Sequence, residues 1–214
     1  MRLALWLALV SSFAALNLAS RTTGERPPDD AVYRLDYALG GLASYALLLS
    51  LVVALTIGVP RREVLALRPP AAWGRAIGLA FGAVIAIFIG AAVALSLSGA
   101  GDEQNLTPEG WDGSRAGAYA LSFLAIVFLG PITEELLYRG VGLTLLLERF
   151  GMPVAVVVTS VLFGLGHGLL LSLAAFVWFG IVAAFVRLRT DSIYPAFIVH
   201  GTFNAVGMIA PLLV

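Results

Sequence analysis

The sequence predicts an all-α protein, a polytopic transmembrane bundle of about seven helices, and three observations lead to that prediction. Of the 214 residues, 60% are hydrophobic and only 12% are charged, whereas soluble domains are nearer 45–50% apolar and about 25% charged. Several uncharged stretches reach the roughly 20 residues that a helix needs to cross about 30 Å of hydrocarbon. Arginines gather in alternate connections, the pattern expected of cytoplasmic loops.

The composition also excludes several classes of function. The net charge is zero, so nothing indicates nucleic-acid binding. The chain has no cysteine, which excludes disulfides, thiolate metal sites and a cysteine nucleophile. All thirteen basic residues are arginine, and alanine, glycine and valine are abundant. We interpret this as a bacterial sequence and expect an integral protein of the inner (cytoplasmic) membrane, with the lipid bilayer as its partner and its oligomeric state open.

The first half, residues 1–115, contains three predicted spans. They are Leu3–Ala19, Tyr37–Val59 and Ile77–Ser98. The first span is either a retained helix or a cleaved signal peptide, and the single arginine before it and Asn17 at the −3 position favour a retained helix. The connection 60–75 carries four arginines and is expected to be cytoplasmic, whereas 99–115 is acidic and suits the opposite side. The N-terminus is therefore predicted to be cytoplasmic.

The second half, residues 116–214, contains four predicted spans. Residues 116–147 indicate one long helix with a kink expected at Pro131. Phe150–Val186 would be about 55 Å long as one helix, too long for a single span, so it must hold two helices with a break near Gly164–Gly168. Their connection is expected within membrane depth, where irregular backbone is tolerated only if it is buried or lines a cavity. Ile193–Leu213 completes the bundle.

The only two histidines, His167 and His200, both lie in apolar segments. Ionisable groups at such depth indicate a functional site by default, although a buried histidine can also serve as a hydrogen bond between helices. Glu134 precedes the turn at 148–151 by about as many residues as separate that turn from His167. On an antiparallel hairpin both lie roughly 22–24 Å from the turn. We therefore expect Glu134 and His167 at the same level. His200, roughly 12–15 Å from the cytoplasmic start of the last helix, is shallower, but the over-long fourth helix leaves room for the three to converge.

Two adjacent carboxylates, Glu134 and Glu135, stand in the fourth span. Glu135 and Arg139 are four residues apart and can pair on one helical face, whereas Glu134 points about 100° away without a local partner. A simple ion pair near the interface would explain Glu135 and Arg139 but leaves Glu134 unexplained. Phe163, four residues before His167, is by itself better interpreted as core packing.

These groups support the activation of water. A carboxylate and a neutral imidazole can hold one water molecule, with Glu134 as general base and His167 as its partner. His200 and the carboxamide of Asn204 can stabilise an oxyanion on a peptide carbonyl. Glu134, His167 and His200 could instead bind zinc. We favour the metal-free arrangement because its acid–base set is complete, and there is no HExxH motif.

Three ordered motifs carry a resemblance to a known family. EELLYR (Glu134–Arg139), FGLGH (Phe163–His167) and HGTFN (His200–Asn204) match the patterns EExxxR, FxxxH and HxxxN. The region from Phe123 to Gly207 therefore resembles the CPBP family of intramembrane endopeptidases, which includes type II CAAX prenyl proteases, bacteriocin-processing and immunity proteins, and the Abi group. Residues 116–214 would form the core of this type, whereas the first three spans share only hydropathy with it.

The resemblance implies an enzyme, an intramembrane protease that is either glutamate-dependent or metallo, acting on a membrane-associated protein or peptide. It implies that Glu134 and His167 activate water and that His200 and Asn204 lie on the oxyanion side. Glu135 and Arg139 would support them, together with Phe163. Two alternatives stay open: a transporter or proton-relay protein, against which stands the absence of repeated halves in the sequence, and a non-catalytic immunity or scaffold member of the same family.

Overall fold

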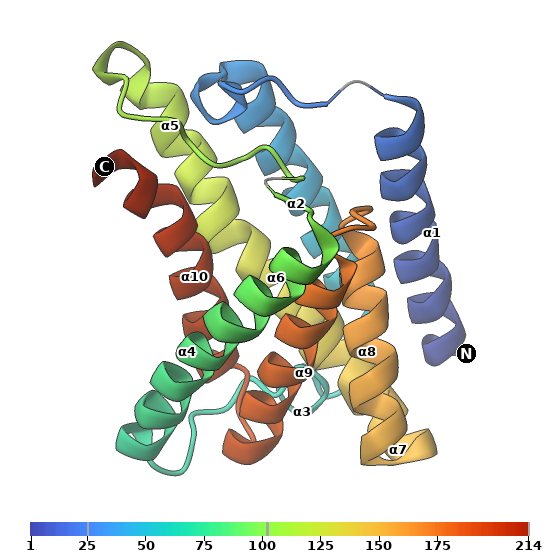
Figure 1. Ribbon diagram of the computed structural model, residues 1–214. Coiled ribbons are helices and arrows are strands. Elements are labelled where there is room, and N and C mark those ends of the chain that lie inside the picture. Colours follow the sequence, from blue (N-terminus) through green and yellow to red (C-terminus); the bar gives the residue numbers. More distant parts are fainter. Residues whose placement is uncertain (25, 102, 214) are drawn as a thin grey trace.

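A computed structural model describes residues 1–24, 26–101 and 103–213, and the described part is helical without strands. In chain order the elements are α1 Arg2–Thr23, η1 Ala31–Tyr33, α2 Leu35–Leu55, α3 Arg61–Val64, α4 Trp73–Ser98, η2 Gly113–Arg115, α5 Ala116–Phe123, η3 Leu124–Leu129, α6 Gly130–Glu135, η4 Leu136–Gly142, α7 Leu143–Phe150, α8 Met152–Gly166, α9 Leu173–Thr190, α10 Tyr194–Ile209 and η5 Ala210–Leu213. Figure 1 shows the long helices side by side as a bundle.

The prediction of an all-α membrane bundle is confirmed. Six helical segments of the described chain are long and apolar enough to cross a membrane: Arg2–Thr23, Leu35–Leu55, Trp73–Ser98, Gly113–Phe150, Leu173–Thr190 and Tyr194–Leu213. The seventh, Met152–Gly166, is apolar but shorter. The protein is therefore an integral, multi-pass membrane protein.

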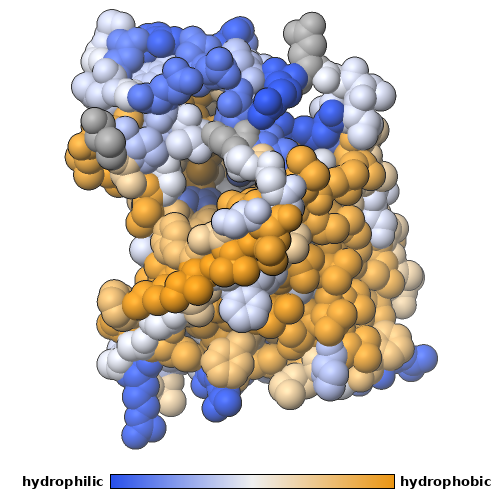
Figure 2. Space-filling model, viewed as in Figure 1, coloured by the Kyte–Doolittle hydropathy of each residue, from blue (hydrophilic) through white to orange (hydrophobic). Residues whose placement is uncertain are grey.

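The two ends of the bundle differ in charge. The N- and C-termini lie at opposite ends (Figure 1). The end that holds α3 and the turn after α7 carries Arg61, Arg62, Arg68, Arg75 and Arg149, whereas the connection that contains Glu103, Glu109 and Asp112 lies at the other end. Between the two ends the face in Figure 2 is apolar. This arrangement agrees with an arginine-rich cytoplasmic end, and the orientation itself stays a prediction.

The fourth span is one long helix, as predicted, and runs from 113 to 150 through Pro131. It contains two π-helical segments, η3 and η4, on either side of α6. The N–H of Gly130 donates to the carbonyl of Ala125, five residues back, and Pro131 has no N–H with which to continue the ladder. A widened π turn thus accommodates the proline, and such turns are frequent at functional sites.

The predicted break near Gly164–Gly168 is confirmed, because α8 ends at Gly166 and α9 begins only at Leu173. Gly168 has a positive φ of 67°, and a Cβ there would overlap the Asn17 carbonyl of α1. Only glycine satisfies both conditions. The connection 167–172 is therefore held against α1, next to His167.

The main core joins all the long helices through buried side chains that include Trp6, Val52, Ile87, Leu137 and Phe179. α1 contributes few of them, since Trp6 and Val10 are its buried residues. Many large apolar side chains point outward instead, among them Leu47, Phe81 and Leu97. Such an outward apolar surface suits a lipid environment.

Candidate active site

The two adjacent glutamates stand at the end of α6, where the helix changes into the π-helical segment η4. The side chain of Glu135 is fully buried, whereas that of Glu134 keeps 12% of its surface exposed. Arg139 follows in η4 and is also fully buried. One glutamate therefore faces the protein interior and the other faces a cavity.

Glu135 is the centre of a buried charge cluster. Its Oε1 accepts hydrogen bonds from Arg139 Nη1 at 3.0 Å and from His200 Nδ1 at 2.9 Å. Arg139 also donates to the carbonyl of Gly180 in α9 at 3.2 Å, and its guanidinium lies over the ring of Phe163, 4.4 Å from the centroid. Arg139 compensates the charge of Glu135, as a buried carboxylate requires.

The hydrogen bonds define which nitrogen of each imidazole is a donor. His200 donates through Nδ1 to Glu135, so its Nε2 faces Glu134 Oε2 at 3.9 Å, too far for a direct hydrogen bond. His167 Nδ1 lies 2.9 Å from the carbonyl of Phe163, which can only accept. In the neutral forms, both Nε2 atoms are therefore free of a proton.

Phe163 is both a core residue and the aromatic wall of the site. Its side chain is buried, and its ring lies 4.8 Å from that of His167, 5.9 Å from that of His200 and 5.4 Å from that of Phe179. The ring of Phe176 stacks on His167 at 3.9 Å. These contacts fix the orientation of both imidazoles.

Asn204 donates through Nδ2 to the carbonyl of Ile126 in η3 at 2.8 Å. That carbonyl lacks a helical donor because the next position in the π ladder is Pro131, which has no N–H. The carboxamide has two N–H groups. One of them anchors α10 to the fourth span, and the other remains for a ligand.

Most of the predicted site residues line one cavity of about 350 Å³. They are Glu134, Phe163, His167, His200 and Asn204. Glu135 and Arg139 do not line this cavity. Glu135 lies behind His200, which it contacts at Nδ1, and Arg139 pairs with Glu135. A second cavity of about 450 Å³, between α1 and α2, also reaches Glu134, Phe163 and His167. Glu134 and His167 thus stand where the two cavities meet.

Both cavities are lined by residues from the acidic end of the bundle. Gly101 and Glu103 line the first, and Arg21 and Pro27 line the second. Glu103 accepts hydrogen bonds from the backbone N–H groups of Leu171 and Ser172, at 3.3 and 2.8 Å. This carboxylate holds the connection after α4 against the start of α9, over the first cavity.

The sequence did not indicate three further contacts around the site. Tyr45 of α2 donates to Glu134 Oε1 at 3.1 Å. In α1, Trp6 donates to the carbonyl of Leu137 at 2.9 Å, and Asn17 donates to the carbonyl of Gly166 at 2.6 Å. The only signal available was the presence of polar atoms in apolar spans, which is too common to single these residues out.

The donors that could bind a metal do not form a metal site as they stand. Among the described residues, no three histidine or acidic side chains are grouped closely enough to hold a metal ion. Two ligand atoms of a tetrahedral zinc ion lie about 3.3 Å apart, given bonds of roughly 2.0–2.1 Å. His200 Nε2 and Glu134 Oε2 are 3.9 Å apart.

The fold and this cavity define a class: a multi-pass membrane protein with a buried glutamate–histidine site. Residues 116–206 match the family model of Rce1-like type II CAAX prenyl endopeptidases. The match confirms the predicted resemblance to the CPBP family over this part of the chain. No curated protein matches the chain. No solved structure matches it either.

Proposed function

We propose that the chain is an intramembrane endopeptidase that hydrolyses a peptide bond in a membrane-associated protein or peptide. The observation that carries this proposal is the single cavity that brings together Glu134, His167, His200 and Asn204. The match of residues 116–206 to an endopeptidase family supports it independently. Residues 116–214 would form the catalytic core, and Tyr45 of α2 would complete it.

In the proposed reaction Glu134 is the general base. It takes a proton from a water molecule oriented by His167 Nε2, and the hydroxide attacks the peptide carbonyl carbon. Glu134 then returns the proton to the departing amine. The tetrahedral oxyanion would be stabilised by the second N–H of Asn204 and by His200.

His200 can stabilise the oxyanion only when Nε2 carries a proton. Because Nδ1 already donates to Glu135, this requires the imidazolium form with both nitrogens protonated. We therefore propose that Glu135 and Arg139 serve the chemistry indirectly, by holding the orientation of His200 through the Nδ1 contact.

We favour this metal-free route because the described donors are not grouped as a metal site. We favour it over a proton relay because both cavities are lined from the same end of the bundle, whereas a relay needs access from both sides.

The test compares the protein with Glu134→Gln. Replacing the base should lower peptide-bond cleavage by at least about 100-fold without changing the melting temperature in detergent. A library of quenched fluorescent peptides supplies the probe, and comparing the peptide termini in membranes with the active and the substituted protein identifies physiological cuts. Glu148→Gln, at the far end of the fourth span, is the matched control.

Two outcomes would contradict the proposal. Cleavage by Glu134→Gln at the rate of the unaltered protein would refute the role of Glu134. Loss of all cleavage on adding a zinc chelator, with recovery on adding zinc, would refute the metal-free route while leaving the endopeptidase assignment intact.

A further inference from the structure

A third cavity, of about 920 Å³, lies at the arginine-rich end of the bundle, away from the proposed catalytic residues. Arg2, Arg68, Arg149 and Arg187 line it, from four different parts of the chain. α1 begins beside it, α2 ends beside it and α7 ends beside it. The cavity therefore lies where three membrane-spanning segments reach the level of the lipid headgroups.

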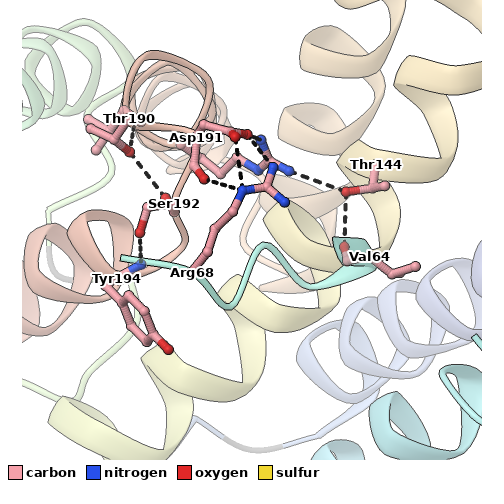
Figure 3. Close-up of polar contacts among 9 residues, drawn as sticks. Val64, Arg68, Thr144, Thr190, Asp191, Ser192 and Tyr194 are labelled. Carbon is pink, nitrogen blue, oxygen red and sulfur yellow. Dashed lines mark hydrogen bonds and ion pairs between the residues drawn. The ribbon is translucent and has the colours of Figure 1, made fainter. Parts of the chain in front are cut away.

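One of these arginines, Arg187, is buried and held by hydrogen bonds to neighbouring side chains. The Arg187 side chain is 7% exposed and donates to Asp191 Oδ1 at 3.3 Å and to Thr144 Oγ1 at 3.4 Å. Its Nε is buried and has no hydrogen-bond partner among the described residues. Thr144 in turn donates to the carbonyl of Val64 at 2.9 Å. Figure 3 shows this network joining α7, α9 and the end of α3.

Asp191 is shared between two guanidinium groups. Arg68 donates from Nε to Asp191 Oδ2 at 2.8 Å and from Nη2 to Oδ1 (Figure 3). Arg187 contacts the same carboxylate through Nη1. One carboxylate cannot neutralise two arginines. Arg149 forms no ion pair with any described residue, and the cavity wall carries only Glu63 and Glu148 as acids. The wall is therefore positive overall.

Apart from Thr144, the rest of the wall is apolar. Leu3 and Leu55 contribute to it, together with Val141 and Leu145 of the fourth span. An occupant that satisfies both parts must combine an anionic group with an aliphatic chain. Basic pockets between membrane helices at the cytoplasmic side are suited to anionic lipid headgroups, and guanidinium groups bind phosphate oxygens in two-pronged hydrogen bonds.

We propose that this cavity binds the headgroup of an anionic phospholipid, with the phosphate against Arg2, Arg149 and Arg187 and an acyl chain along Leu3 and Leu145. A free phosphate ion would satisfy the arginines but would leave the apolar wall without a partner. The lipid would tie α1, which has few buried side chains, to α2 and the fourth span. It would thereby help to hold the helix that contacts Leu137 and Gly166.

The proposal is tested by native mass spectrometry of the full chain purified in detergent and titrated with phosphatidylglycerol or phosphatidylcholine. We expect one phosphatidylglycerol to be retained, about tenfold more tightly than phosphatidylcholine. Arg149→Gln should weaken its binding about fivefold, the factor expected for one basic side chain at an anionic headgroup. Arg149→Lys should retain most of it. Arg149 is exposed, so these variants should fold normally.

The matched control is Arg75→Gln, which removes an exposed arginine at the same end but outside the cavity. Its affinity for phosphatidylglycerol should be unchanged. If Arg75→Gln weakens binding as much as Arg149→Gln, or if the two lipids bind equally, the site is refuted. If millimolar inorganic phosphate displaces the lipid completely, the cavity is a soluble-anion site and the lipid assignment is wrong.

Discussion

At the scale of single residues, the two adjacent glutamates have different roles because they have different partners. Glu135 is neutralised by Arg139 and contacts His200 at 2.9 Å. Glu134 faces the cavity, and its closest donor is the phenol of Tyr45. A hydrogen bond from a hydroxyl group orients a carboxylate without neutralising it. Tyr45 therefore holds Glu134 in place without supplying a neutralising charge, as the proposed role of Glu134 as general base requires.

Tyr45→Phe should lower kcat for peptide cleavage about tenfold, which corresponds to roughly 1.4 kcal/mol of transition-state stabilisation. The physical reason is that Glu134 loses the donor that fixes its carboxylate, while the aromatic ring remains. The measurement is kcat and KM on the best peptide from the library, with the melting temperature in detergent as a check on folding.

Tyr194→Phe is the control for Tyr45→Phe, because Tyr194 lies in α10 outside both cavities near Glu134. It should leave kcat unchanged. Equal losses in the two variants would mean that the effect is general, and an unchanged kcat in Tyr45→Phe would remove Tyr45 from the site.

At the scale of elements, the two π-helical segments shape the fourth span into a site. The widened turn η3 leaves the carbonyl of Ile126 for Asn204. Within η4, the carbonyl of Leu137 accepts from Trp6 of α1. Neighbouring helices thus dock on backbone acceptors of the fourth span, which fixes Glu134 and Glu135 relative to α1 and α10.

The segment η4 also places Arg139 in a fully buried position, where its guanidinium pairs with the Glu135 carboxylate at 3.0 Å. Arg139→Gln should lower the free energy of unfolding by about 3–5 kcal/mol, because the buried carboxylate is left without compensation. The double variant Glu135→Gln with Arg139→Gln should lose less than this, since no uncompensated charge remains. Thermal unfolding in detergent measures both.

Arg34→Gln supplies the comparison for the buried pair, because it removes an exposed ion pair with Asp36. Its effect should stay below about 1 kcal/mol. A loss in Arg139→Gln that is no larger than in Arg34→Gln would show that the Glu135–Arg139 pair does not stabilise the bundle.

At the scale of the whole molecule, Asp191 connects two segments at the arginine-rich end of the bundle. It follows α9 and accepts a hydrogen bond from Arg68, which lies in the connection after α3. The hydrogen bonds from Arg68 hold the pKa of Asp191 below its ordinary value. A carboxyl whose folded-state pKa is lowered contributes stability above the unfolded pKa, near 3.9, and loses it as the pH falls through the folded-state value.

The melting temperature of Asp191→Asn should therefore fall less than that of the unaltered protein as the pH is lowered from about 5 to about 2. Because the Asp191 side chain is 67% exposed, the difference in stability near neutral pH should not exceed about 1 kcal/mol. Glu109→Gln, at an exposed position of the opposite end, should leave the profile unchanged. A profile of Asp191→Asn identical to that of the unaltered protein would contradict the linkage.

The bundle was predictable from the sequence because a membrane span depends on length and hydropathy, and both can be read locally. The residues of the candidate site could be predicted from the sequence for a related reason. Ionisable side chains such as Glu134, His167 and His200 are conspicuous in an apolar chain. Their number is small, so their sequence spacing sufficed to suggest that they converge.

Other parts of the site could not be predicted, for physical reasons. The π turn before Pro131 forms because the backbone accommodates one missing N–H. The spacing of hydrophobic residues along the sequence does not reveal such a turn. Tyr45, Trp6 and Asn17 are ordinary residues in membrane helices, and only tertiary packing selects them. The acceptor of Asn204 is a backbone carbonyl, to which no side-chain pattern points.

The short helix α8 has a consequence for the surrounding bilayer. Its fifteen residues extend for about 22 Å, which is less than the roughly 30 Å thickness of the hydrocarbon layer. In a bilayer we expect local thinning of the lipid or a polar depression over residues 167–172 to relieve the mismatch. His167, at the end of α8, would then lie below the plane of the neighbouring headgroups, and the acyl-chain length of the lipid would act on the proposed reaction centre.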